Sequence, residues 1–257
     1  MPRTPGDTAP EVRPRGALLV TRTALALAAA AAVLGAAPVA AQAAPAVAHP
    51  DSALAPADST VGTNSGPAIG GGSGIVVDGR AVCTLTTIGR DSADRLVGLT
   101  AGHCGKVGAT VVAEADPDSG VLGRFVHSDP ALDYAVIEFD RARVNPVNRI
   151  GGTTITELGA PAQFPAIVCK RGSTSGTSCG VTWGDVRATN TETWTQMCVL
   201  RGDSGAPVVL GSTLVGMVNA FFAVGCFGPE VGTTISAIMA DLNARNDIGA
   251  GYRPVSF

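Results

Sequence analysis

Short runs rich in Val, Ile and Thr, separated by Gly and Asp, recur along this chain from residue 74 to residue 234. The first set ends before the Gly151-Gly152 pair and comprises residues 74–77, 82–88, 96–100, 110–113, 121–126 and 134–139. The second set comprises residues 162–169, 180–189, 193–200, 206–210, 213–222 and 231–234. Runs of this length and spacing predict an all-β chain, folded as an antiparallel barrel or sandwich in two halves of similar size.

The tail of the chain is the part that looks helical. Ile235, Ile238 and Leu242 fall at helical spacing behind Thr233 and Thr234, which suit a helix cap. The pattern predicts a helix over about residues 235–245. Since only 15% of the residues are charged and 4% are aromatic, a long charged helix or coiled coil is not expected.

The N-terminal region has the pattern of a secretory signal. Apolar residues 24–37 follow an arginine-bearing leader and precede the small-residue triplet Ala41-Gln42-Ala43. A helix needs roughly 20 apolar residues to span a bilayer, so a signal is favoured over a membrane anchor. We expect residues 1–43 to be removed and the mature protein to be secreted into the extracellular medium, without membrane insertion.

The remaining chain divides into a linker and a folded domain. Residues 44–68 are rich in Ala, Pro, Ser, Thr and Gly without apolar periodicity, which predicts a flexible segment or a short pro-peptide. The folded domain is then residues 69–257, with a first half at about 69–150 and a second at about 151–234.

Charge and cysteine content exclude several classes of function. Beyond residue 43 the chain has 14 basic and 19 acidic residues, a net charge of −5, so neither nucleic acid nor an anionic lipid surface is an expected partner. All six cysteines lie beyond the signal, and an even number in an exported chain favours disulfides. Without a C-x-x-C spacing, and with His103 and His127 the only histidines after the linker, we expect no metal site and no cofactor.

Two motifs carry the chemistry: Leu99-Thr100-Ala101-Gly102-His103-Cys104 and Arg201-Gly202-Asp203-Ser204-Gly205. A serine hydroxyl is a poor nucleophile on its own and needs a base to take its proton and a carboxylate to orient that base. The α/β-hydrolases run serine, acid, histidine, and no histidine follows Ser204, so that class is excluded. The subtilisin order would need Asp78, Asp91 or Asp94 in a context that is absent, which leaves the order histidine, acid, serine.

These motifs resemble those of the chymotrypsin-like serine peptidases, above all the secreted bacterial branch of alpha-lytic protease and the streptogrisins. The resemblance covers about residues 69–257. It rests on Thr-Ala-Gly-His-Cys at 100–104, Asp-Tyr-x-Val-Ile at 133–137, Gly-Asp-Ser-Gly at 202–205 and a Cys-Lys-Arg-Gly-Ser-Thr-Ser-Gly loop at 169–176. It implies two six-stranded antiparallel Greek-key barrels with a C-terminal helix, and a monomeric serine endopeptidase acting on proteins or peptides.

The resemblance also implies residue roles. His103 is expected to be the general base, Ser204 the nucleophile and Asp133 the orienting acid. Asp129 is a rival acid, but Pro130 follows it and suggests a turn, whereas Asp133 leads the apolar run 134–139. The backbone amides of Gly202 and Ser204 are expected to form the oxyanion hole, and His127 to be structural.

The cysteine pairing comes from the same resemblance, because six cysteines allow 15 pairings. It implies the disulfides Cys83–Cys104, Cys169–Cys179 and Cys198–Cys226. It further implies that Asp203 is held by a base in the loop after Cys169, so we expect Lys170 or Arg171 in that role and no need for cleavage before Ile69.

Substrate preference is where the chain departs from the pattern. The position six residues before Ser204 is Cys198, so no carboxylate is offered there to a basic side chain. The wall strand, Ser-Gly-Gly in the bacterial relatives, is Asn219-Ala220-Phe221 here. If Phe221 points inward it fills the pocket, which predicts a preference for small apolar residues; if Phe221 or Phe222 packs outward, the pocket stays open. Asn219 is expected to donate to Asp133 in place of the usual serine.

The alternative from another functional class is a weakly active or inactive peptidase relative that acts as a secreted binding or signalling module. Labelling of Ser204 by a serine-directed reagent distinguishes the two.

Overall fold

The computed structural model describes residues 66–256. The expected signal at residues 1–43 and most of the expected linker at 44–68 lie outside the described residues. The described chain is almost entirely β-structure, as the strand pattern predicts, with a single α-helix near its C-terminal end. No helix in this part of the chain combines the length and apolarity that crossing a bilayer requires.

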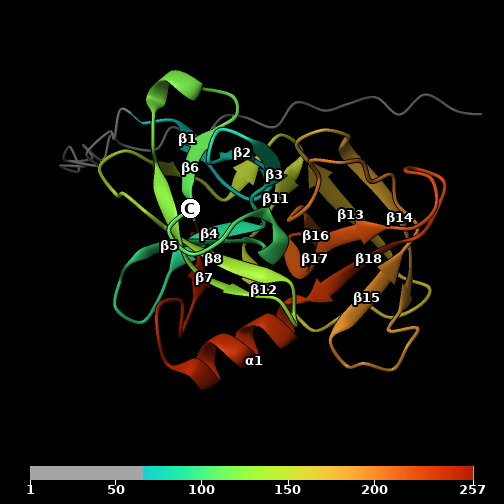
Figure 1. The fold of residues 1–257 in the computed structure, drawn as a ribbon. Helices are drawn as coiled ribbons and strands as arrows, with labels where there is room; N and C mark the ends of the chain where they lie inside the picture. The colour runs from blue at the N-terminus through green and yellow to red at the C-terminus, as the bar shows by residue number, and fades with distance from the viewer. Residues whose placement is uncertain (1–65, 257) are drawn as a thin grey trace, which may run out of the picture. The chain divides into compact units, whose positions relative to one another are not determined.

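The first half forms a curled antiparallel sheet with the strand order β19-β4-β5-β8-β7-β6-β2-β3 (Figure 1). Its strands are β2 (Gly74–Val77), β3 (Ala81–Thr84), β4 (Thr87–Arg90), β5 (Leu96–Ala101), β6 (Thr110–Ala113), β7 (Gly123–Asp129), β8 (Tyr134–Phe139) and β19 (Arg253–Pro254). The two consecutive strands β3 and β4 lie toward opposite ends of this order, so the sheet curls into a half-barrel.

The predicted single strand at 82–88 is wrong, because the chain changes partners at Leu85 and Thr86. The amide of Leu85 donates to the Ser73 carbonyl, beside β2, whereas the amide of Thr86 donates to the Leu99 carbonyl on β5. The segment therefore ends one ladder and starts another. This bend brings β3 to the first half's border with the second.

The second half is a closed barrel. Its order is β12-β17-β16-β13-β14-β15-β18, and an additional pairing of β18 with β17 closes the barrel, with β12 paired to the outside of β17. The strands are β12 (Glu157–Leu158), β13 (Ile167–Gly172), β14 (Gly176–Gly184), β15 (Glu192–Thr195), β16 (Pro207–Leu210), β17 (Thr213–Phe221) and β18 (Glu230–Thr234). All pairings are antiparallel except that of the short β12 with β17. The expected all-β, two-barrel fold class is thus confirmed.

Several strand boundaries differ from the sequence-based expectation. The run at 162–169 becomes a strand only from Ile167, since Pro165 has no amide hydrogen to donate to a ladder. The run at 193–200 ends at Thr195, and the chain then enters the loop that carries Ser204. Two further short strand pairs are β1 (Ala68–Ile69) with β9 (Asn145–Pro146), and β10 (Arg149–Ile150) with β11 (Thr153–Thr154), the latter in the segment between the two halves.

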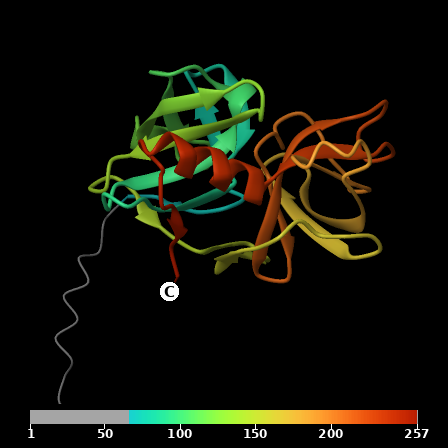
Figure 2. The ribbon, with the colours of Figure 1, turned by 90° about the horizontal axis from the view of Figure 1, so that it is seen from below.

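The predicted C-terminal helix is present as α1 (Ile235–Arg245). It begins where the Thr234 hydroxyl accepts the amide hydrogen of Ala237, a standard N-cap. Its buried face, formed by Ile235, Ile238 and Leu242, packs into the hydrophobic cluster of the first half. Figure 2 shows the helix running from the second barrel toward the first.

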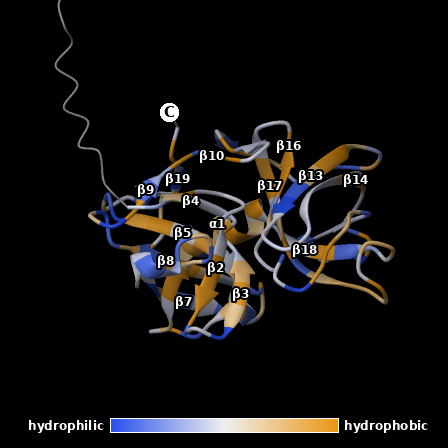
Figure 3. Ribbon diagram, turned by 90° about the horizontal axis from the view of Figure 1, so that it is seen from above, coloured by the Kyte–Doolittle hydropathy of each residue, from blue (hydrophilic) through white to orange (hydrophobic). Residues whose placement is uncertain are grey.

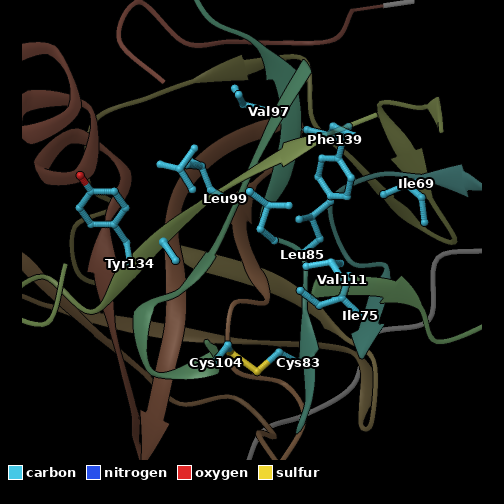
Figure 4. Packing of buried hydrophobic residues seen from close by; sticks show 14 of the residues in the cluster. Ile69, Ile75, Cys83, Leu85, Val97, Leu99, Cys104, Val111, Tyr134 and Phe139 are labelled. Atoms are coloured by element: carbon cyan, nitrogen blue, oxygen red, sulfur yellow. A yellow bond between two sulfur atoms is a disulfide. The ribbon is translucent and has the colours of Figure 1, made fainter. Parts of the chain in front are cut away.

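Two hydrophobic clusters form the core of the described chain. The larger includes Leu85, Leu99 and Phe139 and is shown in Figure 4, where the Cys83–Cys104 bridge lies at its edge. The smaller is made of second-barrel residues: Ala162, Val168, Met197, Val199, Ala206, Val208, Val215 and Val218. Figure 3 shows hydrophobic residues along strands of both halves, as expected when strands bury one face.

Candidate active site

Three loops bring together His103, Asp133 and Ser204. His103 lies in the short 3₁₀ helix Gly102–Cys104 that follows β5, and Asp133 immediately precedes β8. Because β5 and β8 are neighbours with Ala101 opposite Tyr134, the end of one strand adjoins the start of the other. The amide of Gly102 donates to the Asp133 carbonyl at 2.9 Å and fixes the two loops together.

The three side chains form a continuous hydrogen-bonded series. His103 Nδ1 lies 2.8 Å from Asp133 Oδ2, and His103 Nε2 lies 2.9 Å from Ser204 Oγ. The backbone amide of His103 also donates to Asp133 Oδ1, at 2.8 Å. The hydrogen bond to Asp133 raises the pKa of His103 above its ordinary value, against the opposing effect of burial. This arrangement can accept the Ser204 proton on Nε2.

Asp133 is held from behind by Asn219, as expected for this position. Asn219 Nδ2 lies 2.9 Å from Asp133 Oδ2 and 2.7 Å from the Asp133 backbone oxygen. Asn219 Oδ1 accepts from the amide of Thr233, which fixes which end of the Asn219 side chain faces Asp133. Burial opposes ionisation of Asp133, but the hydrogen bonds from His103 and Asn219 outweigh it and lower its pKa.

Asp129 and His127 lie outside this series. Asp129 Oδ1 accepts the amides of Ala131 and Leu132, so it closes the turn that Pro130 predicts. The ring of His127 packs against Tyr134, with centroids 5.4 Å apart. Burial lowers the pKa of His127, which suits a neutral residue packed on a strand.

Asp203, beside the serine, is paired with Lys170. Lys170 Nζ lies 3.0 Å from Asp203 Oδ2, and both side chains have no exposed surface. Asp203 also accepts from the Ser175 hydroxyl and from the amides of Thr174, Ser175 and Leu200. Burial opposes ionisation of Asp203, but these donors and the charge of Lys170 lower its pKa.

Of the two expected bases, Lys170 contacts Asp203 and Arg171 does not. Successive side chains on a strand point to opposite faces, so the inward position of Lys170 puts Arg171 on the other face of β13. The Arg171 side chain lies along Gly72 and Gly151 instead.

The turn that carries Ser204 is anchored by residues from both halves. The Thr84 hydroxyl donates to the Gly202 carbonyl at 2.9 Å, and the Thr84 amide donates to the Ser204 carbonyl at 2.8 Å. The Ser173 hydroxyl also donates to the Gly202 carbonyl. Within residues 66–256, the amides of Gly202 and Ser204 have no hydrogen-bond acceptor.

The cysteines pair as the resemblance implies. The structure contains the bridges Cys83–Cys104, Cys169–Cys179 and Cys198–Cys226. The first ties β3 to the turn that carries His103 (Figure 4). The second links directly opposite positions of β13 and β14, next to Lys170.

The predicted pocket residues separate into different environments. Asn219 faces Asp133, Ala220 is exposed, and Phe221 packs against the hydrophobic cluster of the second barrel. Phe222 instead stacks on Trp194 with ring centroids 5.0 Å apart. Phe221 is thus half-buried against this cluster, whereas Phe222 is exposed.

Three residues have contacts that no sequence motif assigns to them: Thr84, Ser175 and Glu230. A threonine or serine that holds a loop looks like any strand or turn residue. Ser175 lies in the loop between Cys169 and Cys179, and the resemblance of this loop to that of the bacterial branch is the nearest sequence indication of its position.

Comparison with known proteins finds similarity to bacterial proteases. No protein-family model matches the chain. Serine protease 2 of Streptomyces fradiae is 28% identical over 162 residues, which span 59% of this chain and 93% of that protein.

Two solved structures have a similar fold. Thermobifida fusca Protease A matches with a TM-score of 0.58 and 27% identity, over 74% of this chain and 100% of that one. The Nocardiopsis protease matches with a TM-score of 0.61 and 23% identity, over 74% and 100% of the two chains. In sequence and in fold, this chain is therefore similar to the bacterial chymotrypsin-like serine proteases, and the similarity supports a serine endopeptidase.

Proposed function

We propose that the protein is a secreted serine endopeptidase that cleaves peptide bonds through His103, Asp133 and Ser204 and a covalent acyl-enzyme. The observation that carries the proposal is the unbroken series from Asp133 through His103 to Ser204 Oγ, next to two amides without internal acceptors. Base, nucleophile and anion-binding donors are the groups that acyl transfer requires.

The first half-reaction forms the acyl-enzyme. Ser204 Oγ bonds to the scissile carbonyl carbon while its proton passes to His103 Nε2. The carbonyl oxygen becomes an oxyanion that the amides of Gly202 and Ser204 stabilise, a contribution of about 3 to 4 kcal/mol per donor in related chemistry. The carbon–nitrogen bond then breaks, and His103 gives its proton to the leaving amine.

The second half-reaction releases the acid. Water takes the place of the amine, gives a proton to His103 and bonds to the acyl carbon; the ester bond to Ser204 breaks and Oγ regains its proton. A hollow of about 480 Å³ lined by His103, Cys104 and Ser128 adjoins the base. Asp133 keeps the imidazole oriented and stabilises its charged form.

The acyl-side pocket is proposed to accept small apolar residues such as Ala or Val. The half-buried Phe221 ring supports this, because it packs against the hydrophobic cluster of the second barrel, which includes Val199 and Val218. We also propose that the protein acts as a monomer outside the cell; sequencing the N-terminus of protein recovered from culture medium tests the predicted cut after Ala43.

Covalent labelling with a fluorophosphonate tests the proposed function. The reagent requires an activated serine, so the mature protein should be labelled at Ser204 and Ser204→Ala should not. A correctly disulfide-bonded protein that resists labelling would favour an inactive, binding-type relative instead.

A further inference from the structure

Glu230 is a buried carboxyl group that the proposed reaction does not use. Its side chain has no exposed surface. Oε1 accepts from the Thr195 hydroxyl, but Oε2 is buried and, within the described residues, has no hydrogen-bond partner. Burial raises the pKa of Glu230 to about 8, against the opposing effects of Thr195 and of the Lys170 charge.

Lys170 makes no hydrogen bond to the Glu230 carboxyl group, although its positive charge lowers the pKa of that group. The three hydrogens of its ammonium group point to Ser175 Oγ, the Gly176 carbonyl and Asp203 Oδ2. Both carboxylate oxygens of Asp203, next to Ser204, already accept hydrogen bonds. The second acceptor of Glu230 is therefore left for a group that the folded chain does not supply.

Glu230 lies directly opposite Phe221. The two are Cα partners in the antiparallel β17–β18 pair, and Thr195 is the Cα partner of Glu230 on the other side. Side chains at directly opposite positions lie on the same face of a sheet with Cβ atoms about 5 Å apart. Because Phe221 packs into the cluster inside the second barrel, Glu230 is on the inner face with it.

The strand that carries Phe221 leads to the wall of the proposed acyl-side pocket. The Gly205 amide, next to Ser204, donates to the Val218 carbonyl at 2.8 Å, so β17 runs beside the nucleophile before reaching Phe221. A methyl group added at Gly225 would lie 2.7 Å from the Val199 carbonyl oxygen and 3.7 Å from Phe221 Cε2. Gly225 therefore lies close both to the edge of the Phe221 ring and to the segment that precedes Ser204.

We propose that Phe221 and Glu230 form a two-residue plug of the acyl-side pocket, in which Phe221 limits the size of the bound side chain and Glu230 selects a basic one once the ring is removed. The inference rests on the proposed function and extends it with a specificity-determining residue. A lysine or arginine side chain would donate to the unpartnered Oε2, and its positive charge would stabilise the ionised form of the Glu230 carboxyl group that burial disfavours. An aromatic or aliphatic side chain offers Oε2 no hydrogen bond and would leave this buried polar atom without a partner, which is unfavourable.

The test compares the wild type with Phe221→Gly, Glu230→Gln and the double variant. Peptides that differ only in the residue before the cut, Ala, Phe, Lys or Arg, give kcat/KM for each. Phe221→Gly should gain activity on Lys and Arg and prefer them to Phe by at least tenfold. The double variant, which has an amide of the same size at position 230, should lose that preference and cleave after Phe at least as well as after Arg.

A second measurement needs no change at Glu230, in case the double variant fails to fold. Benzamidine and its neutral analogue benzamide compete with peptide for Phe221→Gly, and the cation should inhibit at least tenfold more strongly. Equal inhibition by the two compounds, or a Phe221→Gly enzyme that prefers Phe over Arg, overturns the proposal. Fluorophosphonate labelling separates the two levels: an unlabelled wild type contradicts the proposed function, whereas a labelled Phe221→Gly without basic preference contradicts only the role of Glu230.

Discussion

The side chain of Asn219 binds Asp133 at two atoms, donating to its carboxylate at 2.9 Å and approaching its backbone carbonyl at 2.7 Å. Both contacts come from one amide group whose orientation is set by the Thr233 amide, which donates to Asn219 Oδ1. The second barrel therefore positions the carboxylate of the first. This dependence makes Asn219 a positioning residue in the proposed mechanism.

Asn219→Ala should lower kcat by about 10- to 100-fold with a small change in KM, because a partly buried carboxylate loses a donor. Asn219→Ser is the matched variant, since its hydroxyl can supply one of the two hydrogen bonds and should restore part of the rate. Peptide hydrolysis measured for both variants decides the matter. An alanine variant with wild-type kcat would contradict the positioning role.

The pH dependence follows from the raised pKa of His103. The reaction needs a neutral imidazole, so kcat/KM should fall as pH drops through a His103 pKa that lies above its ordinary value of 6.5. Asp133→Asn removes the main cause of that rise. It should shift the acidic limb to lower pH and reduce kcat by about 10⁴-fold. Profiles of kcat/KM against pH for both proteins test this, and an acidic limb that does not move would count against the assignment.

Lys170 and Arg171 should differ sharply in their effect on stability. Lys170→Gln leaves Asp203 buried without its counter-charge, which typically costs about 3 to 5 kcal/mol in the free energy of unfolding. Arg171→Gln is the control, because that side chain does not contact Asp203, and it should change stability by less than about 1 kcal/mol. Urea unfolding of the two variants measures both changes. Equal decreases in the free energy of unfolding would contradict a stabilising role for the buried Lys170–Asp203 pair.

Cleavage before Ile69 should not be required for activity. In this structure Asp203 is already bound by Lys170, Ser175 and the Leu200 amide, and Ile69 is paired with Pro146 in the β1–β9 strand pair. A protein that begins at Ala44 and one that begins at Ile69 should therefore react with a fluorophosphonate at rates within about twofold. A long form that is inert until it is trimmed to Ile69 would show that a new N-terminus is needed.

Much of the fold is visible in the sequence because its signals are local. Strand runs and their separating turns depend on neighbouring residues, and the helix at Ile235–Arg245 combines periodic apolar residues with the Thr234 cap. The order of His103, Asp133 and Ser204 and their motifs are likewise read directly along the chain. Asp129 could be set aside for a local reason, the proline that follows it.

What only the tertiary structure decided depends on contacts between distant residues. The break between β3 and β4 arises because Leu85 and Thr86 donate to different strands, which no local pattern reveals. The choice of Lys170 over Arg171 depends on which face of β13 turns inward. The pairing of Phe221 with Glu230 depends on the register of β17 against β18. The sequence by itself determined the chemistry that the chain can carry, whereas register and burial decided which side chains meet, since both are properties of the packed chain as a whole.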